Sequence, residues 1–220
     1  MPKEYVESFI SYVNDFDYVS VREKQGAKII MDLCGREAKV VLDPTLLIGR
    51  DFWLSLLKRK YKKPFKKYIF CYIFSNEQRH SDYLKKIQKE TGLPIVYVNV
   101  SNLSYDGLNA QNKEFVDPLG FLQLIKNAEF VVTDSFHGTA FSLLFNKDFY
   151  VFKRGRSDEK INMFSRIESI LSVAGLEDRI VSLDEPFKLK EHIDYVAVDE
   201  KLDQLRNSSL HYLRNALQDE

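Results

Sequence analysis

Hydrophobic residues recur along the chain with two different spacings. Short runs rich in β-branched and aromatic residues predict strands, whereas apolar residues at every third or fourth position predict amphipathic helices. The predicted strands span 18–21, 38–42, 68–74, 95–100, 129–133 and 149–152. The predicted helices span 2–13, 23–33, 50–61, 80–90, 118–127, 137–145, 160–173 and 199–217. Strands that alternate with helices in this way pair as a parallel sheet.

The predicted strands are nearly continuous in hydrophobicity, which indicates burial on both faces of the sheet. The sequence therefore predicts an α/β fold, a Rossmann-like parallel sheet with helices on both faces. Asp43 and Pro44 favour an extended turn, and we place a domain boundary in the segment that follows. A polar loop is expected over 101–116. The last helix carries one apolar stripe that must dock elsewhere on the chain, made of Leu202, Leu205, Leu210, Leu213 and Leu217.

Composition and charge narrow the class of protein. The 220 residues include 32 Lys and Arg against 32 Asp and Glu, a balance that excludes the strongly basic surface of a general nucleic-acid binder. The longest apolar runs, such as 68–74, are far shorter than the ~20 residues of a membrane-spanning helix, so no transmembrane segment is expected. No apolar stretch follows Met-Pro-Lys-Glu at the start of the chain, which indicates that there is no secretory signal and favours a cytoplasmic location.

The basic run at 58–67 and the two cysteines do not by themselves indicate a catalytic site. Seven of the ten residues in 58–67 are basic. They either touch the anionic inner face of a membrane or form a solvated connection at a helix end that Pro64 terminates. Cys34 and Cys71 are expected to stay reduced as small hydrophobic residues. The sequence has no phosphate-binding Gly-rich loop, dinucleotide motif or Cys/His cluster, so neither a metal nor a cofactor is expected.

Other residues with useful chemistry receive no role. His80, His192 and His211 lie on polar stretches that are expected to be exposed, and they lack metal-ligand spacing. Trp53 forms an aromatic helix face together with Phe52 and Tyr61. Such a face either stacks on a sugar or, more commonly, packs in the core.

The segment 117–145 carries the clearest candidate for chemistry. A buried strand ends at Thr133, and a polar turn leads into a helix that begins near His137. Ligands of open α/β sheets bind at the carboxyl ends of strands, where a helix N-terminus offers free N–H groups and a positive dipole end to an anion. Ser135 either caps this helix or donates its hydroxyl to the anion, and Gly138 lets a ligand approach the backbone closely. In the alternative interpretation the turn only caps the helix.

The turn and its helix, VVTDSFHGTAFSLLF at 131–145, resemble the signature of the polysaccharide pyruvyl transferase family. Three other segments are similar to that family in the same order, namely YVSVRE at 18–23, VVLDPTLL at 40–47 and DEKINMFSRIESILSVAGLEDRI at 158–180. The resemblance implies two Rossmann-like halves in a glycosyltransferase-B-like arrangement. It also implies transfer of pyruvyl from phosphoenolpyruvate onto sugar hydroxyls as a ketal, in the synthesis of cell-surface polysaccharides.

The resemblance implies roles for individual residues of the turn. His137 is expected to transfer the proton, because an imidazole acts as acid and base near neutral pH. Ser135, Phe136 and Gly138 are expected to lie beside the donor. Together these residues make 135–138 the predicted catalytic and donor-binding turn.

Several basic side chains are candidates for the two anionic groups of the donor. Arg22 offers a planar fork that matches a carboxylate or a phosphate, unless it pairs with Glu23 at the surface. Lys160 matches a lysine of the family and either faces the phosphate or belongs to a solvated helix surface. Arg166 can serve instead. Three further cations follow the preceding strand and can face the same crevice, and the sequence leaves the choice among them open: Lys153, Arg154 and Arg156.

In length the chain resembles the complete second half of such a protein but only the last strand-helix-strand of the first half. We therefore expect residues 1–48 to be the remnant of an N-terminal Rossmann-like domain, 49–198 to form the donor-binding domain, and 199–220 to pack back as a helix. A glycan or lipid-linked saccharide acceptor then lacks an opposite wall, which favours a dimer or a separate N-terminal domain. The alternatives are a nucleotide-sugar-dependent glycosyltransferase of similar architecture and a non-catalytic partner subunit.

Overall fold

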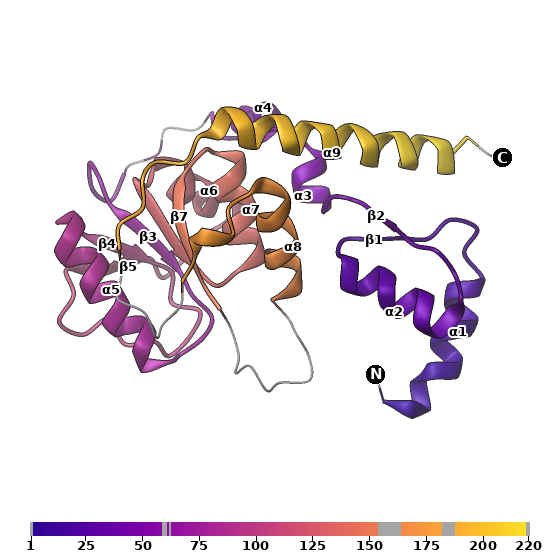
Figure 1. The fold of residues 1–220 in the computed structure, drawn as a ribbon. Coiled ribbons are helices and arrows are strands. Elements are labelled where there is room, and N and C mark those ends of the chain that lie inside the picture. Colours follow the sequence, from indigo (N-terminus) through magenta and orange to yellow (C-terminus); the bar gives the residue numbers. More distant parts are fainter. Residues whose placement is uncertain (1, 59–60, 62, 154–163, 182–187, 219–220) are drawn as a thin grey trace.

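The computed structural model describes residues 2–58, 61, 63–153, 164–181 and 188–218, and within them the chain forms two separate parallel sheets (Figure 1). The smaller sheet pairs β1 (Ser20–Val21) with β2 (Lys39–Val40). The larger sheet contains six strands of the described chain: β3 (Ile69–Tyr72), β4 (Ile95–Tyr97), β5 (Ala110–Asn112), β6 (Phe130–Thr133), β7 (Asp148–Phe152) and β8 (Ile180–Val181).

The strand order across the larger sheet is β5-β4-β3-β6-β7-β8. Counted along the chain, this is third, second, first, fourth, fifth and sixth, which is the order of a Rossmann sheet. The order reverses between β3 and β6, which pair from Ile69 with Phe130 to Tyr72 with Thr133. The predicted fold class, a Rossmann-like parallel sheet with helices on both faces, is confirmed. The topology also marks the reversal as the place where a ligand is expected.

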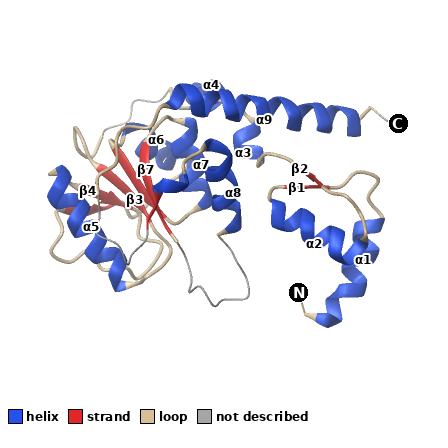
Figure 2. Cartoon of the chain, in the orientation of Figure 1, coloured by secondary structure: helices blue, strands red, loops and turns tan. Residues whose placement is uncertain are grey.

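Helices cover both faces of the larger sheet (Figure 2). One face packs against α5 (Gln78–Thr91), and the other packs against α6 (Pro118–Asn127), α7 (Phe136–Leu144) and α8 (Ser165–Ala174). Successive strand residues point to opposite faces, so the neighbours Phe70 and Cys71 lie fully buried in two different clusters of the core. The continuous hydrophobicity of the strands is explained by this double coverage.

The N-terminal segment builds the smaller sheet. It contains the 3-10 helix η1 (Lys3–Tyr5), α1 (Val6–Asn14) and α2 (Lys24–Cys34). α2 connects β1 to β2 and ends at Gly35, whose φ of 63° is left-handed and therefore suits glycine. The short helix α3 (Pro44–Leu47) begins with Asp43 as its cap, because the Asp43 carboxylate accepts a hydrogen bond from Thr45 N at 3.0 Å. α4 (Arg50–Leu56) leads toward the larger sheet.

The last helix, α9 (Tyr195–Ala216), runs from the larger sheet to the N-terminal segment (Figure 1). Leu202 is buried in the core, whereas Leu217 at the far end is exposed, so the apolar stripe docks over part of its length. Two polar contacts hold the helix to the chain around α3. The Ser209 hydroxyl accepts a hydrogen bond from Leu42 N at 3.0 Å, and Arg206 Nε donates to the Leu46 carbonyl at 2.9 Å.

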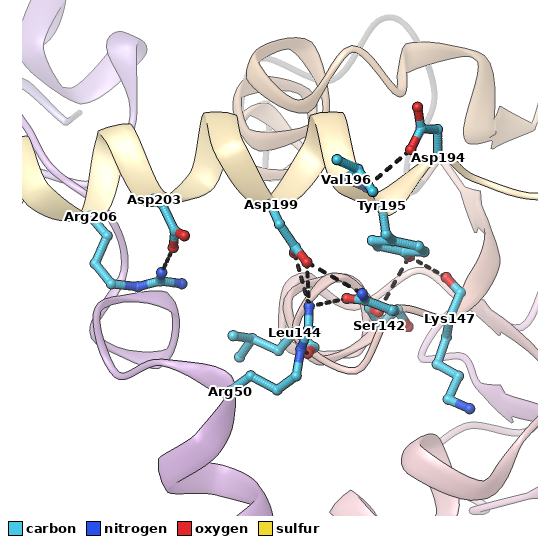
Figure 3. Close-up of polar contacts among 11 residues, drawn as sticks. Arg50, Ser142, Leu144, Lys147, Asp194, Tyr195, Val196, Asp199, Asp203 and Arg206 are labelled. Carbon is cyan, nitrogen blue, oxygen red and sulfur yellow. Dashed lines mark hydrogen bonds and ion pairs between the residues drawn. The ribbon is translucent and has the colours of Figure 1, made fainter.

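Arg50 ties three helices together (Figure 3). From α4 its Nη2 donates to both carboxylate oxygens of Asp199 on α9, at 2.9 and 2.8 Å, and its Nε donates to the Leu144 carbonyl at the end of α7 at 2.5 Å. The Tyr195 hydroxyl at the start of α9 donates to the Lys147 carbonyl, just after α7, and lies 3.4 Å from the Ser142 carbonyl within α7. These contacts dock α9 on the carboxyl end of α7.

Some elements differ from those expected. β5 lies within the predicted loop 101–116. It pairs only with β4 at the edge of the sheet, where a strand does not need apolar side chains, so its polar sequence does not predict a strand. The structure adds α3, β8 and the 3-10 helix η2 (Glu177–Arg179), which are too short to produce a period. The helix expected over 50–61 ends at Leu56. Cys34 and Cys71 are both free thiols, and burial strongly raises the pKa of Cys71.

Candidate functional site

The carboxyl ends of β3 and β6 meet at the reversal of the strand order, and Asp134 joins them. Its side chain is almost fully buried. One carboxylate oxygen accepts a hydrogen bond from Phe74 N at 2.8 Å, and the other accepts from Ser75 N at 2.8 Å and from the Ser75 hydroxyl at 2.7 Å. Asp134 therefore fixes the segment after β3 against the turn after β6, at the place where α/β sheets bind ligands.

The turn after β6 leads into α7 through a cap made by Ser135. The Ser135 hydroxyl accepts a hydrogen bond from Gly138 N at 3.4 Å, so it caps the helix. Phe136 N and His137 N, in contrast, have no hydrogen-bond acceptor among the described residues. Free N–H groups and the positive end of a helix dipole are the features that favour an anion at a helix N-terminus.

Packing between the helix and the strand requires a glycine at position 138, which is a reason that the sequence pattern does not reveal. A Cβ at this position would lie 2.4 Å from Thr133 Oγ1. Thr133 is fully buried, and its hydroxyl donates to the Tyr72 carbonyl at 2.6 Å and accepts from Ser135 N at 3.0 Å. Gly138 is itself buried, so the lack of a side chain serves the close approach of α7 to β6.

His137 is the exposed residue of the turn. It follows Phe136, and the two ring centroids lie 5.6 Å apart with nearly perpendicular planes. Ser135 and Gly138 on either side are buried. The His137 imidazole is thus presented to solvent at the positive end of α7, where it can exchange a proton with a bound molecule.

A cavity of about 180 Å³ lies between the smaller sheet and the helices α7, α8 and α9. It brings together three of the predicted substrate-binding residues, Arg22, Phe136 and Arg166. The Arg166 guanidinium carbon lies 5.1 Å from the centre of the Phe136 ring, which is the distance of a cation–π contact. Most of the remaining lining is apolar and comes from both sides of the cavity, for example Val40, Leu42, Leu46, Ile170 and Val173.

Arg22 is paired within this cavity with Asp43, and not with Glu23, which was its partner in the alternative interpretation. Its Nη1 lies 2.6 Å from the Asp43 carboxylate, whereas Glu23 accepts a hydrogen bond from Ser165 at the start of α8. Burial alone would raise the pKa of Asp43, but hydrogen bonds from Thr45 and Arg22 outweigh it and lower that pKa. Asp43 is therefore ionised, and it holds Arg22 at the cavity wall while the Arg22 side chain remains 47% exposed.

The other predicted cations have different places. Lys153 forms an ion pair with Glu168 on α8 at 3.3 Å. Lys160, Arg154 and Arg156 lie outside the described residues. The cavity-lining Asp43 and the bridging Glu23 received no role from the sequence, although both lie in segments that carry the family resemblance.

His80, His192 and Trp53 make contacts outside the cavity. His80 is fully buried, contrary to the expectation that it is exposed, because its ring stacks on Phe152 with centroids 4.5 Å apart. His192 is exposed and contacts Asp148. Trp53 packs edge-on against Phe141 with centroids 5.1 Å apart and, like Tyr61, lies against the core, whereas Phe52 is exposed. Among the described residues, no three His, Cys, Asp or Glu side chains gather closely enough to hold a metal ion.

The fold resembles that of a solved glycosyltransferase. The chain aligns with the crystal structure of the glycotransferase of kitacinnamycin at a TM-score of 0.50 and 14% identity, over 97% of this chain and 60% of that one. It aligns with the UDP-GlcNAc 2-epimerase of Methanocaldococcus jannaschii at a TM-score of 0.48 and 14% identity, over 86% of this chain and 61% of that one. The chain thus spans about three fifths of the length of these structures. At 14% identity the first likeness shows the fold alone, that of a glycosyltransferase-like α/β protein.

The family follows from the sequence profile that matches residues 1–156, more than half of the chain and including the turn before α7. The chain belongs to the polysaccharide pyruvyl transferase family, whose members are transferases of polysaccharide biosynthesis. The match ends before Lys160 and Arg166. A comparison with curated protein sequences finds no match. No helix in the described part of the chain is long and apolar enough to span a membrane.

Proposed function

We propose that this chain binds phosphoenolpyruvate and supplies the donor side of pyruvyl transfer to sugar hydroxyls. The observation that carries the proposal is the meeting of Arg22, Phe136 and Arg166 at one cavity, in a chain of the pyruvyl transferase family. Phosphoenolpyruvate has two anionic groups, a carboxylate and a phosphate. Two guanidinium groups and the N-terminus of α7 supply matching positive charge. Lys160 is a further candidate for the phosphate.

The surroundings of the two arginines favour anion binding. Apolar side chains form much of the cavity wall, and a low local dielectric strengthens the attraction between a guanidinium and an anion. Arg22 already donates to Asp43, but a guanidinium has five N–H donors and can hold two anions at once. Asp43 then acts as the fixed partner that orients Arg22 toward the donor.

In the proposed reaction a proton adds to the methylene carbon of phosphoenolpyruvate, and a sugar hydroxyl forms a bond to the neighbouring carbon. Phosphate leaves with the electron pair of its C–O bond, and a second hydroxyl closes the ketal. The two hydroxyls release two protons, of which one balances the proton taken up by the methylene carbon and the other goes to the released phosphate. His137 is the proposed proton donor, because it is exposed beside Phe136 at the positive end of α7.

We also propose a division of the chain, with residues 1–48 in an N-terminal Rossmann-like domain, 49–198 in the donor domain and 199–220 as the returning helix. Two separate sheets and the contacts of α9 with both regions support this division. The acceptor, a glycan or lipid-linked saccharide, would bind opposite the donor. Since the chain spans about three fifths of the solved structures, we expect slow transfer by these 220 residues alone.

A nucleotide-sugar-dependent glycosyltransferase is the second candidate. The likeness to the glycotransferase of kitacinnamycin favours it, because a nucleotide diphosphate also suits a helix N-terminus at the end of a strand. The two candidates differ in the ligand that the native chain binds.

The test is calorimetric titration of the full chain with phosphoenolpyruvate and, separately, with uridine diphosphate sugars. Arg22→Ala and Arg166→Ala are each expected to weaken phosphoenolpyruvate binding about 10- to 100-fold, the loss of one or two hydrogen bonds to a charged group. Arg214→Ala is the matched control, because Arg214 is exposed on α9, away from the cavity. Binding of the uridine diphosphate sugar without binding of phosphoenolpyruvate would support the second candidate instead.

A second measurement separates chemistry from binding. His137→Ala is expected to remove phosphate release with a glycan acceptor while changing donor affinity and thermal stability little, because His137 is exposed and packs in no cluster of the core. His211→Ala is the matched histidine control, since His211 is exposed on α9. Unfolding of the His137→Ala variant, or unchanged phosphate release, would contradict the role of His137 as proton donor.

A further inference from the structure

A chain of three side chains lies behind the turn that carries His137. His80, in the first turn of α5, is fully buried, and its Nδ1 lies 2.9 Å from the Ser75 hydroxyl oxygen. The same hydroxyl lies 2.7 Å from the Asp134 carboxylate. The His80 ring also stacks on Phe152 with an angle of 5° between the planes. The stack and the contact with Ser75 together fix the orientation of the ring.

The count of protons sets the direction of each hydrogen bond. A serine hydroxyl has one hydrogen, and an ionised carboxylate only accepts, so Ser75 donates to Asp134. The Ser75 oxygen can then only accept from His80, and His80 Nδ1 must carry the proton. In the neutral ring Nε2 is left with a lone pair. His80 Nε2 is buried and makes no hydrogen bond in the described part of the chain.

The surroundings of His80 keep its ring neutral. A proton added at Nε2 would place an unpaired N–H in the protein interior, which is costly. Burial lowers the pKa of His80, and Arg79 lowers it further, whereas Glu77 and Asp134 raise it by a smaller amount. The net effect is a lowered pKa, in agreement with the tautomer that the hydrogen bonds require.

The hydrogen bonds of Ser75 and His80 determine which way the Asp134 carboxylate points. Asp134 precedes the cap residue Ser135, so its negative charge lies one residue from the N-terminus proposed to bind an anion. Like charges repel, and a carboxylate turned toward that N-terminus would oppose a phosphate or carboxylate there. Hydrogen bonds from Phe74 and Ser75 instead hold the Asp134 carboxylate toward the end of β3.

We propose that Ser75 and His80 are positioning residues that hold Asp134 against the end of β3 and so keep the N-terminus of α7 open to the anionic donor. The His80 Nδ1–H polarises the Ser75 hydroxyl, which strengthens its bond to Asp134. Neither residue touches the donor in this assignment. The proposal rests on the proposed function for the identity of the donor, but not for the arrangement of protons.

The arrangement of protons is tested on the native chain by ¹⁵N nuclear magnetic resonance of its histidines. His80 is expected to show a protonated Nδ1 and an unprotonated Nε2 at pH 8, and to take up a proton at Nε2 only at a pH below the ordinary pKa of histidine, about 6.5. A protonated Nε2 on His80 at pH 8, or uptake of this proton at or above the ordinary pKa of histidine, would overturn the assignment.

The positioning role is tested with three variants titrated with phosphoenolpyruvate and with inorganic phosphate. His80→Phe keeps the stack on Phe152 but removes the donor, whereas His80→Asn keeps an N–H near the position of Nδ1 and removes the stack. We expect His80→Phe and Ser75→Ala to weaken binding about 10-fold, because each loses one hydrogen bond of the network that holds the Asp134 carboxylate. His80→Asn keeps that hydrogen bond and should bind within about 3-fold of the native chain. Ser75→Ala removes only an oxygen atom and keeps the test valid if His80→Phe does not fold.

The amide resonances of His137 and Gly138 give a readout that needs no ligand. They are expected to shift in His80→Phe and Ser75→Ala and to return toward their native positions in His80→Asn. If the native chain binds neither anion but these shifts occur, the proposed function fails and the positioning role stands. If the native chain binds phosphoenolpyruvate and all three variants match it in affinity and amide shifts, the positioning role is wrong.

Discussion

Replacing Gly138 with alanine puts a methyl group where the structure has no room for one. The added Cβ would lie 2.4 Å from Thr133 Oγ1 and 3.0 Å from both Thr133 Cβ and Thr133 Cγ2. Thr133 is β-branched and therefore stiff about χ1, and its hydroxyl is held by Tyr72 and Ser135. The clash can be relieved only by moving α7 away from β6 or by breaking the bonds of the Thr133 hydroxyl.

The expected loss of stability follows from these contacts. Overpacking of a buried position costs about 1–3 kcal/mol, and a buried hydroxyl that loses its partners adds about 1–3 kcal/mol. Alanine in place of glycine in a helix returns about 1 kcal/mol. We therefore expect Gly138→Ala to lower the free energy of unfolding by about 1–5 kcal/mol.

Urea unfolding followed by tryptophan fluorescence measures this change. Trp53 is the only tryptophan, and it packs on Phe141 of α7, so its emission reports on the helix that the substitution displaces. Gly26→Ala is the matched control. Gly26 lies within α2, and a Cβ there meets its nearest neighbour, Val21 Cβ, at an ordinary 3.4 Å, so this variant is expected to be neutral or up to about 1 kcal/mol more stable.

A double-mutant cycle with Thr133→Ala identifies the cause. Removing the Thr133 hydroxyl and methyl groups takes away the contacts to Oγ1 at 2.4 Å and to Cγ2 at 3.0 Å, and leaves the one to Cβ at 3.0 Å. The double variant should therefore be less destabilised than the sum of the two single variants. Additive effects, or a Gly138→Ala variant within about 0.5 kcal/mol of the native chain, would refute the packing argument.

Three further predictions concern stability. Burial lowers the pKa of His80, so as the pH falls the unfolded chain takes up a proton before the folded chain does, and the free energy of unfolding should fall below about pH 6.5. Urea titrations of the native and His80→Phe chains from pH 8 to pH 5 measure this change. The same dependence of the free energy of unfolding on pH in both chains would contradict the prediction. Arg50→Ala should cost about 1–3 kcal/mol by releasing α9 from α7, whereas Lys28→Ala, which breaks an exposed pair with Asp32, should cost under about 0.5 kcal/mol. Asp117→Ala removes the cap that accepts from Gly120 N at 2.6 Å and should lower the melting temperature by the equivalent of about 1 kcal/mol, with Asp117→Asn close to native.

The type of most elements could be predicted from the sequence because both faces of the larger sheet are covered. Burial on both sides makes β3, β6 and β7 almost entirely apolar, and polar turns separate them from the helices. β5 was not predicted, because at the sheet edge the strand Ala110–Asn112 needs no apolar side chains. The strand order also could not be derived from the pattern, since hydrophobic periodicity carries no information about which strands pair.

The candidate site also has parts that could be predicted from the sequence and parts that could not. The turn at 134–138 was predicted because strand end, histidine, glycine and helix start coincide in the sequence. The burial of His80 was not predicted, because the polar run around it hides a ring that stacks on Phe152 of a distant strand. The Arg22–Asp43 pair was missed for a related reason, since a local reading pairs Arg22 with its neighbour Glu23.

The contacts of α9 with the chain around α3 bear on the order in which the protein folds. Leu42 and Ser209 are 167 positions apart, and Leu46 and Arg206 are 160 positions apart. A two-stranded sheet has little stability alone, and contacts between distant positions form slowly because a long loop must close first. During synthesis, therefore, the region of the smaller sheet completes its structure only when α9 has been made, after the larger sheet has formed.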